Sequence, residues 1–337
     1  EDELAAAGMV IGANWVGARA FTPTSGPGIS LMSEFIGFAY YAEIPSVFIN
    51  VQRVGPSTGM PTRTQQSDTM LCAYASHGDT RHPILFPADP HECFEMAVKS
   101  FDLAERLQTP VFLLSDLDIG MNDWMVPELN WDDTYRPDRG KVLRADDLAE
   151  IERFTRYLDT DGDGIPYRTL PGDDPKGAYF TRGSGHNKHG AYTEDSDEYQ
   201  EILDRLLVKW DTAKTLVPDA VLSSSPRKTK LGMIAYGSSD GAVIEARDRL
   251  AERGIHVNYL RIRAFPFTSE VHEFLEAHDT IYVVEQNRDA QMKALLMLEA
   301  NDIADRLVSI LHYNGMPIPS ECVVTGVTRH QGMEVAA

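Results

Sequence analysis

The fold is decided by residues 46–62, SVFINVQRVGPSTGMPT. Its apolar start, Val47-Phe48-Ile49, is typical of a strand buried on both faces, as in a parallel sheet. Further strands are predicted at 18–22, 83–86 and 110–114, and helices at 3–17, 29–42 and 92–107. This alternation of strand and helix predicts an α/β fold with a parallel sheet.

The alternating pattern stops at residue 122 and returns near residue 231. Residues 122–223 are rich in Asp and Gly and show little strand periodicity, which predicts an irregular insertion that closes over a site. One helix is predicted within it, near 197–213. After a polar joint at 223–230, a second α/β domain is predicted, with strands at 231–236, 257–262 and 280–285 and helices at 242–253, 269–277 and 290–301.

The composition limits the class of protein. A chain of 337 residues is long enough for two domains of roughly 100–200 residues each. The net charge of -20 argues against nucleic-acid binding, because the chain would repel the phosphate backbone. Three well-separated cysteines predict no disulfide framework, favour a reducing cytoplasm, and are too few for a four-thiolate iron–sulfur cluster.

Two further expectations concern targeting and the chain ends. No apolar run approaches the roughly 18 residues that a membrane span needs, and no signal peptide is visible. The first residue is Glu1 rather than Met, and the helix–strand unit that it opens looks incomplete. We therefore expect the sequence to be part of a longer protein.

Two turns carry the candidate binding residues. The turn Thr24-Ser25-Gly26-Pro27-Gly28 follows a predicted strand and opens a helix, a position where α/β sheets bind ligands. After the strand at 46–51, Arg53 is followed by a loop rich in Gly, Pro and hydroxyl groups. An arginine there can hold a carboxylate through two parallel hydrogen bonds. The alternatives are a purely structural turn and a rigid surface loop whose arginine pairs with an aspartate.

Metal sites are not predicted. The run Asp159–Gly164 resembles the start of a calcium loop, but the twelfth position is Leu170 where a closing glutamate is needed, so an acidic turn is favoured over a bound cation. Gly162-Asp163-Gly164 with Asn187 imitates the metal motif of thiamine-diphosphate enzymes. We reject that interpretation because no buried strand precedes it and the spacing is short. Any diphosphate site would then belong to another chain or domain.

Several blocks together resemble the α subunit of 2-oxoacid:ferredoxin oxidoreductases, especially the 2-oxoglutarate type. They occur in family order along nearly the whole chain: Glu1–Ala6, Thr24–Gly28, Leu31–Glu34, Val51–Thr62, Gln66–Asp68, Asp163–Gly172 and Val283–Asn287. The resemblance implies a pyrimidine-type thiamine-diphosphate-binding domain over residues 1–215, with its insertion at about 122–200. It implies a domain similar to the transketolase carboxyl-terminal domain over residues 216–337. A tyrosine-proline-isoleucine-threonine-proline turn on an earlier strand, usual in the family, is missing.

The resemblance also implies roles for single residues. Glu3, which the sequence alone favours as a solvated glutamate, would hydrogen-bond N1′ of the aminopyrimidine, so that the imino nitrogen can remove the thiazolium proton. Residues Thr24, Ser25, Gly26, Pro27 and Gly28 would line the cofactor pocket. Substrate contacts are implied for Arg53, Ser57, Thr58 and Thr62.

The implied reaction is the coenzyme-A-dependent oxidative decarboxylation of 2-oxoglutarate to succinyl-CoA with reduction of ferredoxin, or its CO₂-fixing reverse. A β subunit would hold Mg²⁺, the cofactor diphosphate and a [4Fe–4S] cluster, in an (αβ)₂-type assembly with a γ domain or subunit. The choice of 2-oxoacid stays open. So do two alternatives, the β chain of an NAD-linked 2-oxoacid dehydrogenase and a calcium-dependent interaction module.

Overall fold

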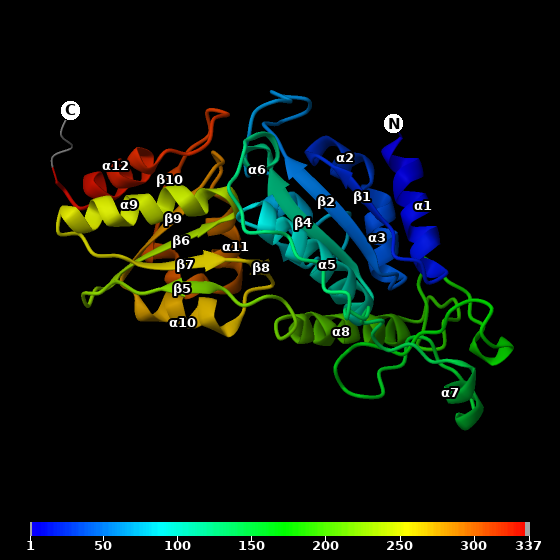
Figure 1. Ribbon diagram of the computed structural model, residues 1–337. Coiled ribbons are helices and arrows are strands. Elements are labelled where there is room, and N and C mark those ends of the chain that lie inside the picture. The colour runs from blue at the N-terminus through cyan, green and yellow to red at the C-terminus, as the bar shows by residue number, and fades with distance from the viewer. Residues whose placement is uncertain (1, 334–337) are drawn as a thin grey trace.

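The computed structural model describes residues 2–333, which contain two five-stranded sheets lying side by side (Figure 1). Glu1, which opens the first family-like block, and residues 334–337, the end of the predicted second domain, lie outside the described residues.

The first sheet has the strand order β1-β2-β4-β3-β8. The central strand β2 (Ser46–Gln52) pairs in parallel with β1 (Phe21–Thr24) and with β4 (Pro110–Asp116), which in turn pairs in parallel with β3 (Ile84–Leu85). The strand predicted from residues 46–51 is therefore confirmed, and it lies in the middle of a parallel sheet.

Both faces of this sheet are covered, as the apolar run at its centre requires. Val47 packs with α5 (Pro90–Leu107) on one face, and Phe48 packs with α2 (Gly26–Leu31) and α3 (Ser33–Tyr41) on the other. The helix α1 (Glu3–Trp15) runs beside α3 at the edge near β1 (Figure 1). The single helix predicted at 29–42 is wrong in one respect, because the chain forms two helices that meet at Met32.

The second sheet has the order β10-β9-β6-β7-β5. Its parallel strands are β6 (Leu231–Tyr236), β7 (Asn258–Ile262), β9 (Thr280–Glu285) and β10 (Leu307–Leu311), and β5 (Val221–Ser223) joins antiparallel to β7. One face packs on α9 (Asp240–Glu252) and α12 (Ser320–His330), and the other on α10 (Ser269–Ala277) and α11 (Gln291–Glu299). Sequence periodicity predicted β6, β9 and α10 with these bounds but missed β5, β10 and α12.

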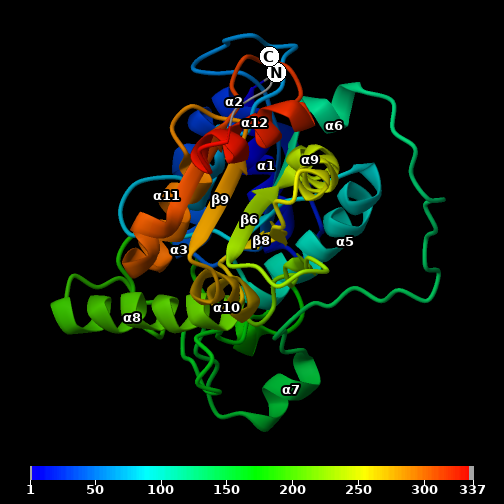
Figure 2. The ribbon, with the colours of Figure 1, turned by 90° about the vertical axis from the view of Figure 1, so that its left-hand side faces the viewer.

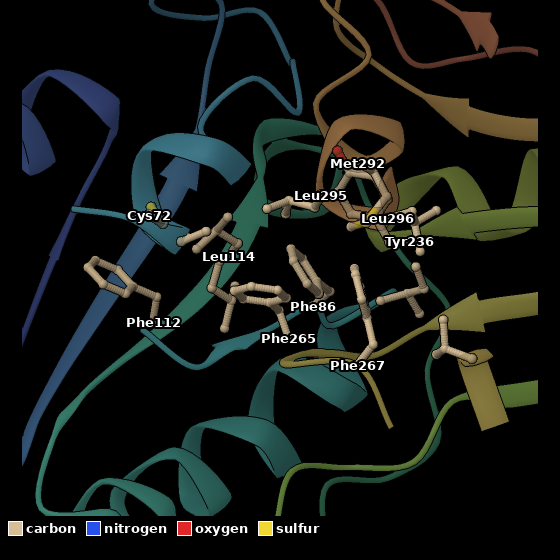
Figure 3. Packing of buried hydrophobic residues seen from close by; sticks show 14 of the residues in the cluster. Cys72, Phe86, Phe112, Leu114, Tyr236, Phe265, Phe267, Met292, Leu295 and Leu296 are labelled. Carbon is tan, nitrogen blue, oxygen red and sulfur yellow. The ribbon is translucent and has the colours of Figure 1, made fainter. Parts of the chain in front are cut away.

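One apolar core joins the two sheets (Figure 3). It runs from Phe112 on the first sheet through Phe86 and Phe265 to Leu295 and Leu296 on α11. The two-residue strand β8 (Ala264–Phe265) comes from the second half of the sequence and pairs antiparallel with β3 of the first sheet. The two sheets are therefore connected by a shared core and by a shared strand pairing.

The insertion starts at the top of the first sheet, next to the short helix α6 (Leu117–Met121), and its later part with α7 (Ala145–Glu150) and α8 (Ser196–Ala213) lies below this sheet (Figure 1). It follows α6, is mostly irregular apart from the short α7, and leads into the long α8. A further short helix, α4 (Thr69–Ala73), follows the Arg53 loop. Among residues 2–333, no helix combines the length and apolarity needed to cross a membrane.

Candidate functional site

A cavity of about 850 Å³ opens between the two sheets, at the carboxyl ends of their strands. Residues from both halves of the chain line it. They include Gly26, Arg53, Ser57, Asp68, Asn287 and Gln291. The carboxyl ends of parallel strands are where α/β proteins bind ligands, so this position agrees with a functional site.

Arg53 lies directly after β2 on the wall of this cavity. Its side chain is half-buried, and its buried Nε has no hydrogen-bond partner among the described residues. A buried donor without a partner costs free energy. Several other buried arginine Nε atoms of the described residues, Arg205 among them, also lack a partner, so Arg53 is distinguished by its position on the cavity wall. Within residues 2–333, Arg53 forms no ion pair with an aspartate, as the alternative would require. The guanidinium therefore remains available to an anion.

The Asp68 carboxylate is affected by the positive charge of Arg53. Asn50 Nδ2 donates to Asp68 Oδ2 at 3.0 Å, and the Asp68 backbone N–H donates to Gln52 Oε1 at 3.0 Å. Burial raises the pKa of the Asp68 carboxyl, and the Asn50 hydrogen bond and the Arg53 charge oppose this only in part. Sequence analysis placed Asp68 in a family-like block but gave it no role.

The turn Thr24–Gly28 is shaped by two close approaches. A Cβ on Gly26 would lie 2.6 Å from Asp68 Oδ2, and a Cβ on Gly28 would collide with the Thr24 hydroxyl. Glu3 reaches the same turn, because its Cγ would lie 3.2 Å from a Cβ on Gly28. Glu3 is held in the first turn of α1, where Asp2 caps the helix by accepting from the Ala5 N–H. The structure thus brings together Glu3 and the predicted cofactor turn.

The loop 55–62 forms one rim of the cavity. Gly59 has a φ of +51°, and a Cβ there would collide with the Val54 carbonyl, so the tight return of this loop requires glycine. Ser57 lines the cavity, whereas Thr58 and Thr62 are exposed on the same loop outside its lining.

The second half of the chain clamps this site through hydrogen bonds. Gln66 Nε2 donates to the Tyr236 carbonyl at 3.0 Å, and Asn287 Nδ2 donates to the Gln66 carbonyl at 2.9 Å. Gln291 Nε2 donates to the Ser67 carbonyl at 2.6 Å. Two family-like blocks, Gln66–Asp68 and Val283–Asn287, therefore meet directly, although nothing in either block alone indicates the contact.

The acidic turn Asp159–Gly164 is satisfied internally. Lys141 Nζ lies 2.7 Å from Asp161 Oδ2 and 2.8 Å from Asp163 Oδ1, and the Asp159 carboxylate accepts from three backbone N–H groups. Within residues 2–333, no group of three His, Cys, Asp or Glu side chains has the geometry to hold a metal ion. The geometry is that of a structural turn.

Comparison with known proteins identifies the family. Residues 1–152 match the family described as pyruvate flavodoxin/ferredoxin oxidoreductase, thiamine diphosphate-binding. The chain is 34% identical over 292 residues to the 2-oxoglutarate synthase subunit KorA of Methanothermobacter thermautotrophicus, covering 85% of this chain and 74% of that one. The chain belongs to the 2-oxoacid:ferredoxin oxidoreductase α-subunit family.

Other relatives agree with this membership. The α subunit of 2-oxoacid:ferredoxin oxidoreductase 1 from Sulfurisphaera tokodaii is 36% identical over 324 residues, covering 94% of this chain and 49% of the relative. The chain thus spans about half the length of the first curated relatives that it matches. Membership of this family argues against the alternative of the β chain of an NAD-linked 2-oxoacid dehydrogenase.

Solved structures confirm the fold. The 2-oxoglutarate:ferredoxin oxidoreductase from Magnetococcus marinus, solved with 2-oxoglutarate, coenzyme A and succinyl-CoA bound, matches with a TM-score of 0.87 and 28% identity, over 98% of this chain and 56% of that one. A split-gene transketolase matches 99% of this chain and 83% of its own with a TM-score of 0.54 at 13% identity, a similarity of fold alone. The predicted class, a thiamine-diphosphate-binding parallel-sheet domain followed by a transketolase-like α/β domain, is confirmed.

Proposed function

We propose that this chain is the α part of a 2-oxoglutarate:ferredoxin oxidoreductase. It would take part in the coenzyme-A-dependent conversion of 2-oxoglutarate to succinyl-CoA with reduction of ferredoxin, or in the reverse, CO₂-fixing direction. The observation that carries the proposal is Arg53, whose buried Nε is without a partner at the wall of the cavity between the sheets. The ligands of the Magnetococcus marinus enzyme and the name of the Methanothermobacter relative support 2-oxoglutarate as the substrate.

Substrate binding is assigned to the Arg53 loop. A guanidinium can hold a carboxylate by two parallel hydrogen bonds, and the carboxylate of a 2-oxoacid is such a partner. Ser57, Thr58 and Thr62 on the same loop would supply hydroxyl groups to the keto and carboxylate oxygens. Ser57 already lines the cavity, and the other two are exposed beside it.

The described residues also fit thiamine diphosphate. Glu3 lies beside the turn at Gly26–Gly28, and Gly26 and Pro27 of this turn line the cavity. Glu3 would hold a proton at N1′ of the aminopyrimidine, and residues Thr24, Ser25, Gly26, Pro27 and Gly28 would line the pocket. The cofactor would supply the electron sink that decarboxylation of a 2-oxoacid needs. We assign this role to residues 1–215 and a supporting role to residues 216–337.

The diphosphate, Mg²⁺ and a [4Fe–4S] cluster are assigned to a β subunit, and a γ domain or subunit would complete an (αβ)₂-type assembly. The name of the Sulfurisphaera tokodaii relative, an α subunit, supports a heteromeric enzyme. Electrons leaving the 2-oxoacid would pass one at a time through that cluster to ferredoxin.

The test is viologen- or ferredoxin-linked oxidation of 2-oxoglutarate, pyruvate and a branched 2-oxoacid by the complex purified with its native partner, with and without coenzyme A. We expect coenzyme-A-dependent reduction with 2-oxoglutarate alone. Reduction with pyruvate instead would overturn the substrate, and reduction with none of them would overturn the reaction.

The first variant to measure is Arg53→Ala. Hydrogen bonds to charged groups contribute about 1.5–3 kcal/mol, so we expect the KM for 2-oxoglutarate to rise about 10- to 100-fold. Arg53→Lys is the matched control, because it keeps the charge but loses the paired donors. Its KM should lie between the KM of the wild type and that of Arg53→Ala. An unchanged KM in Arg53→Ala would remove Arg53 from the substrate site.

A further inference from the structure

The insertion begins with an exposed apolar segment, which we name the arm and define as residues 121–135. Six of its large apolar side chains are each at least 36% exposed: Met121, Trp124, Met125, Val126, Leu129 and Trp131. Figure 2 shows the chain beyond α6 running down well apart from α5 before it returns toward the body of the protein.

The arm is fixed at both ends. Near its start, Trp124 Nε1 donates to the Asp118 carbonyl at 3.1 Å. Near its end, the Trp131 ring packs edge-on against Phe94, with ring centres 6.3 Å apart, and the Tyr135 hydroxyl donates to Asp102 Oδ1 at 2.7 Å. The segment is therefore an anchored loop rather than a free tail.

Between these anchors the backbone of the arm is free of hydrogen bonds to the rest of the described backbone. Within residues 2–333, no backbone N–H from 123 to 131 donates a hydrogen bond to another backbone group. Large exposed apolar patches on soluble proteins mark interaction sites. An extended segment with free backbone groups can also pair with the edge of another sheet.

The charge of the arm identifies the kind of partner. Four carboxylates, Asp123, Glu128, Asp132 and Asp133, lie among the apolar residues, and residues 121–135 contain no Lys or Arg. The whole chain carries a net charge of -20, so a second copy would bring like charge against like. A complementary surface is an apolar groove bordered by Lys or Arg on a different polypeptide.

We propose that the arm docks into such a groove on the second subunit of the enzyme and thereby helps to hold the heteromer together. This inference rests on the heteromeric enzyme proposed above. The apolar side chains enter the groove, the carboxylates pair with its basic border, and the backbone of 123–131 gains acceptors from the partner chain.

The decisive variant is Met125→Ser/Val126→Ser/Leu129→Ser, made in the complex expressed with its native second subunit. Its matched control is Ile244→Ser/Leu298→Ser, which removes exposed apolar side chains from the other half of the chain. Mass photometry over a dilution series would give the α–β dissociation constant. We expect at least a tenfold rise for the arm variant and less than a twofold change for the control, with circular dichroism unchanged in both.

Hydrogen exchange of the intact wild-type complex gives an independent answer. Because the amides of 123–131 have no backbone acceptor within the described chain, protection of these amides in the complex would come from the partner. We expect exchange at least a hundredfold slower than in an unstructured peptide. Exchange at the unstructured rate would overturn the proposal.

The outcomes separate this inference from the proposed function. An unchanged dissociation constant in the arm variant, in a complex that oxidises 2-oxoglutarate, overturns the arm alone. Loss of α–α association with intact α–β pairs overturns it as well, in favour of a second copy as the occupant. A complex that needs the arm for assembly yet oxidises no 2-oxoacid supports the arm and overturns the reaction.

Discussion

At the cavity, Arg53 keeps a buried Nε without a partner, whereas behind the insertion the buried carboxylate of Glu43 is bound from two sides. Arg205 on α8 forms a two-pronged ion pair with Glu43, and Lys209 Nζ lies 2.8 Å from Glu43 Oε2. At the cavity, the positive charge of Arg53 remains available to a ligand that enters from solvent. The arrangement around Glu43 places opposite charges together where no ligand can reach them.

The two sites differ in their access to ligands. An unsatisfied buried donor costs free energy, but Arg205 Nε also lacks a partner among residues 2–333. The position of Arg53 on the cavity wall, and not the missing partner alone, therefore indicates a binding role. A buried ion pair with additional hydrogen bonds is consistent with a structural role, and here it attaches α8 to the end of α3 next to β2.

The largest effect is expected for Glu43→Gln. Removing one member of a buried ion pair leaves uncompensated charge, which costs about 3–5 kcal/mol of unfolding free energy. Here Arg205 and Lys209 would both lose their carboxylate. Glu34→Gln, a largely exposed glutamate on α3, is the control and should change stability by less than about 0.5 kcal/mol. Urea unfolding of the complex measures both, and equal midpoints would show that the pair is not structural.

The same carboxylate should make stability depend on pH. Burial alone would raise the pKa of Glu43, but Arg205 and Lys209 outweigh it and hold the pKa well below its ordinary value of 4.5. The unfolded chain therefore binds a proton first as the pH falls, so the stabilisation is complete above about pH 5 and is lost below it. Glu43→Gln lacks this loss, and its unfolding midpoint should vary less between pH 6 and pH 3 than that of the wild type.

A smaller effect, on the cavity side, is expected for Gly26→Ala. The new Cβ would lie 2.6 Å from Asp68 Oδ2, which Asn50 holds in place, so either the turn or the carboxylate must shift. Overpacking of this kind costs about 1–3 kcal/mol. Gly12→Ala in α1 meets nothing within 4 Å and should stabilise the helix by up to about 1 kcal/mol. If both variants changed the urea midpoint in the same direction, the close approach would not matter.

Only the cavity residues of the first half of the chain could be predicted from the sequence. The apolar run at 46–51 and the glycine-rich segment at 24–28 are local signals. The run was located correctly on β2, whereas the segment at 24–28 spans the end of β1 and the first residues of α2, which begins at Gly26 and not at Ile29. The clamp from Gln286 and Asn287 joins residues about 220 positions apart, and no local periodicity encodes such a contact. The same limit applies to β8, because a strand of two residues has no period to detect.

In the insertion, the local structure could be predicted from the sequence but the charge pairs could not. Its many Asp and Gly residues correctly predicted irregular structure, but nothing in the sequence assigned partners to its charges. Arg168 pairs with Glu105 at 2.9 Å, and Arg19 pairs with the same carboxylate at 2.6 Å, although these residues are far apart in sequence. Charge pairs between distant segments depend on the tertiary fold, so the sequence could not show that Lys141 pairs with two carboxylates of the acidic turn at 159–164.

The smallest effect is expected for Lys141→Ala, which removes the amine between Asp161 and Asp163. These groups are partly exposed, and exposed ion pairs contribute at most about 1 kcal/mol, so the loss should stay near or below that value. Lys188→Ala, which breaks the more exposed pair with Glu201, is the control and should lose only a few tenths of that amount. Because the lysine already occupies the turn, Ca²⁺ and a chelator should leave the wild-type midpoint unchanged. A midpoint that rises with Ca²⁺ would restore the cation site that Leu170, in place of a closing glutamate, argues against.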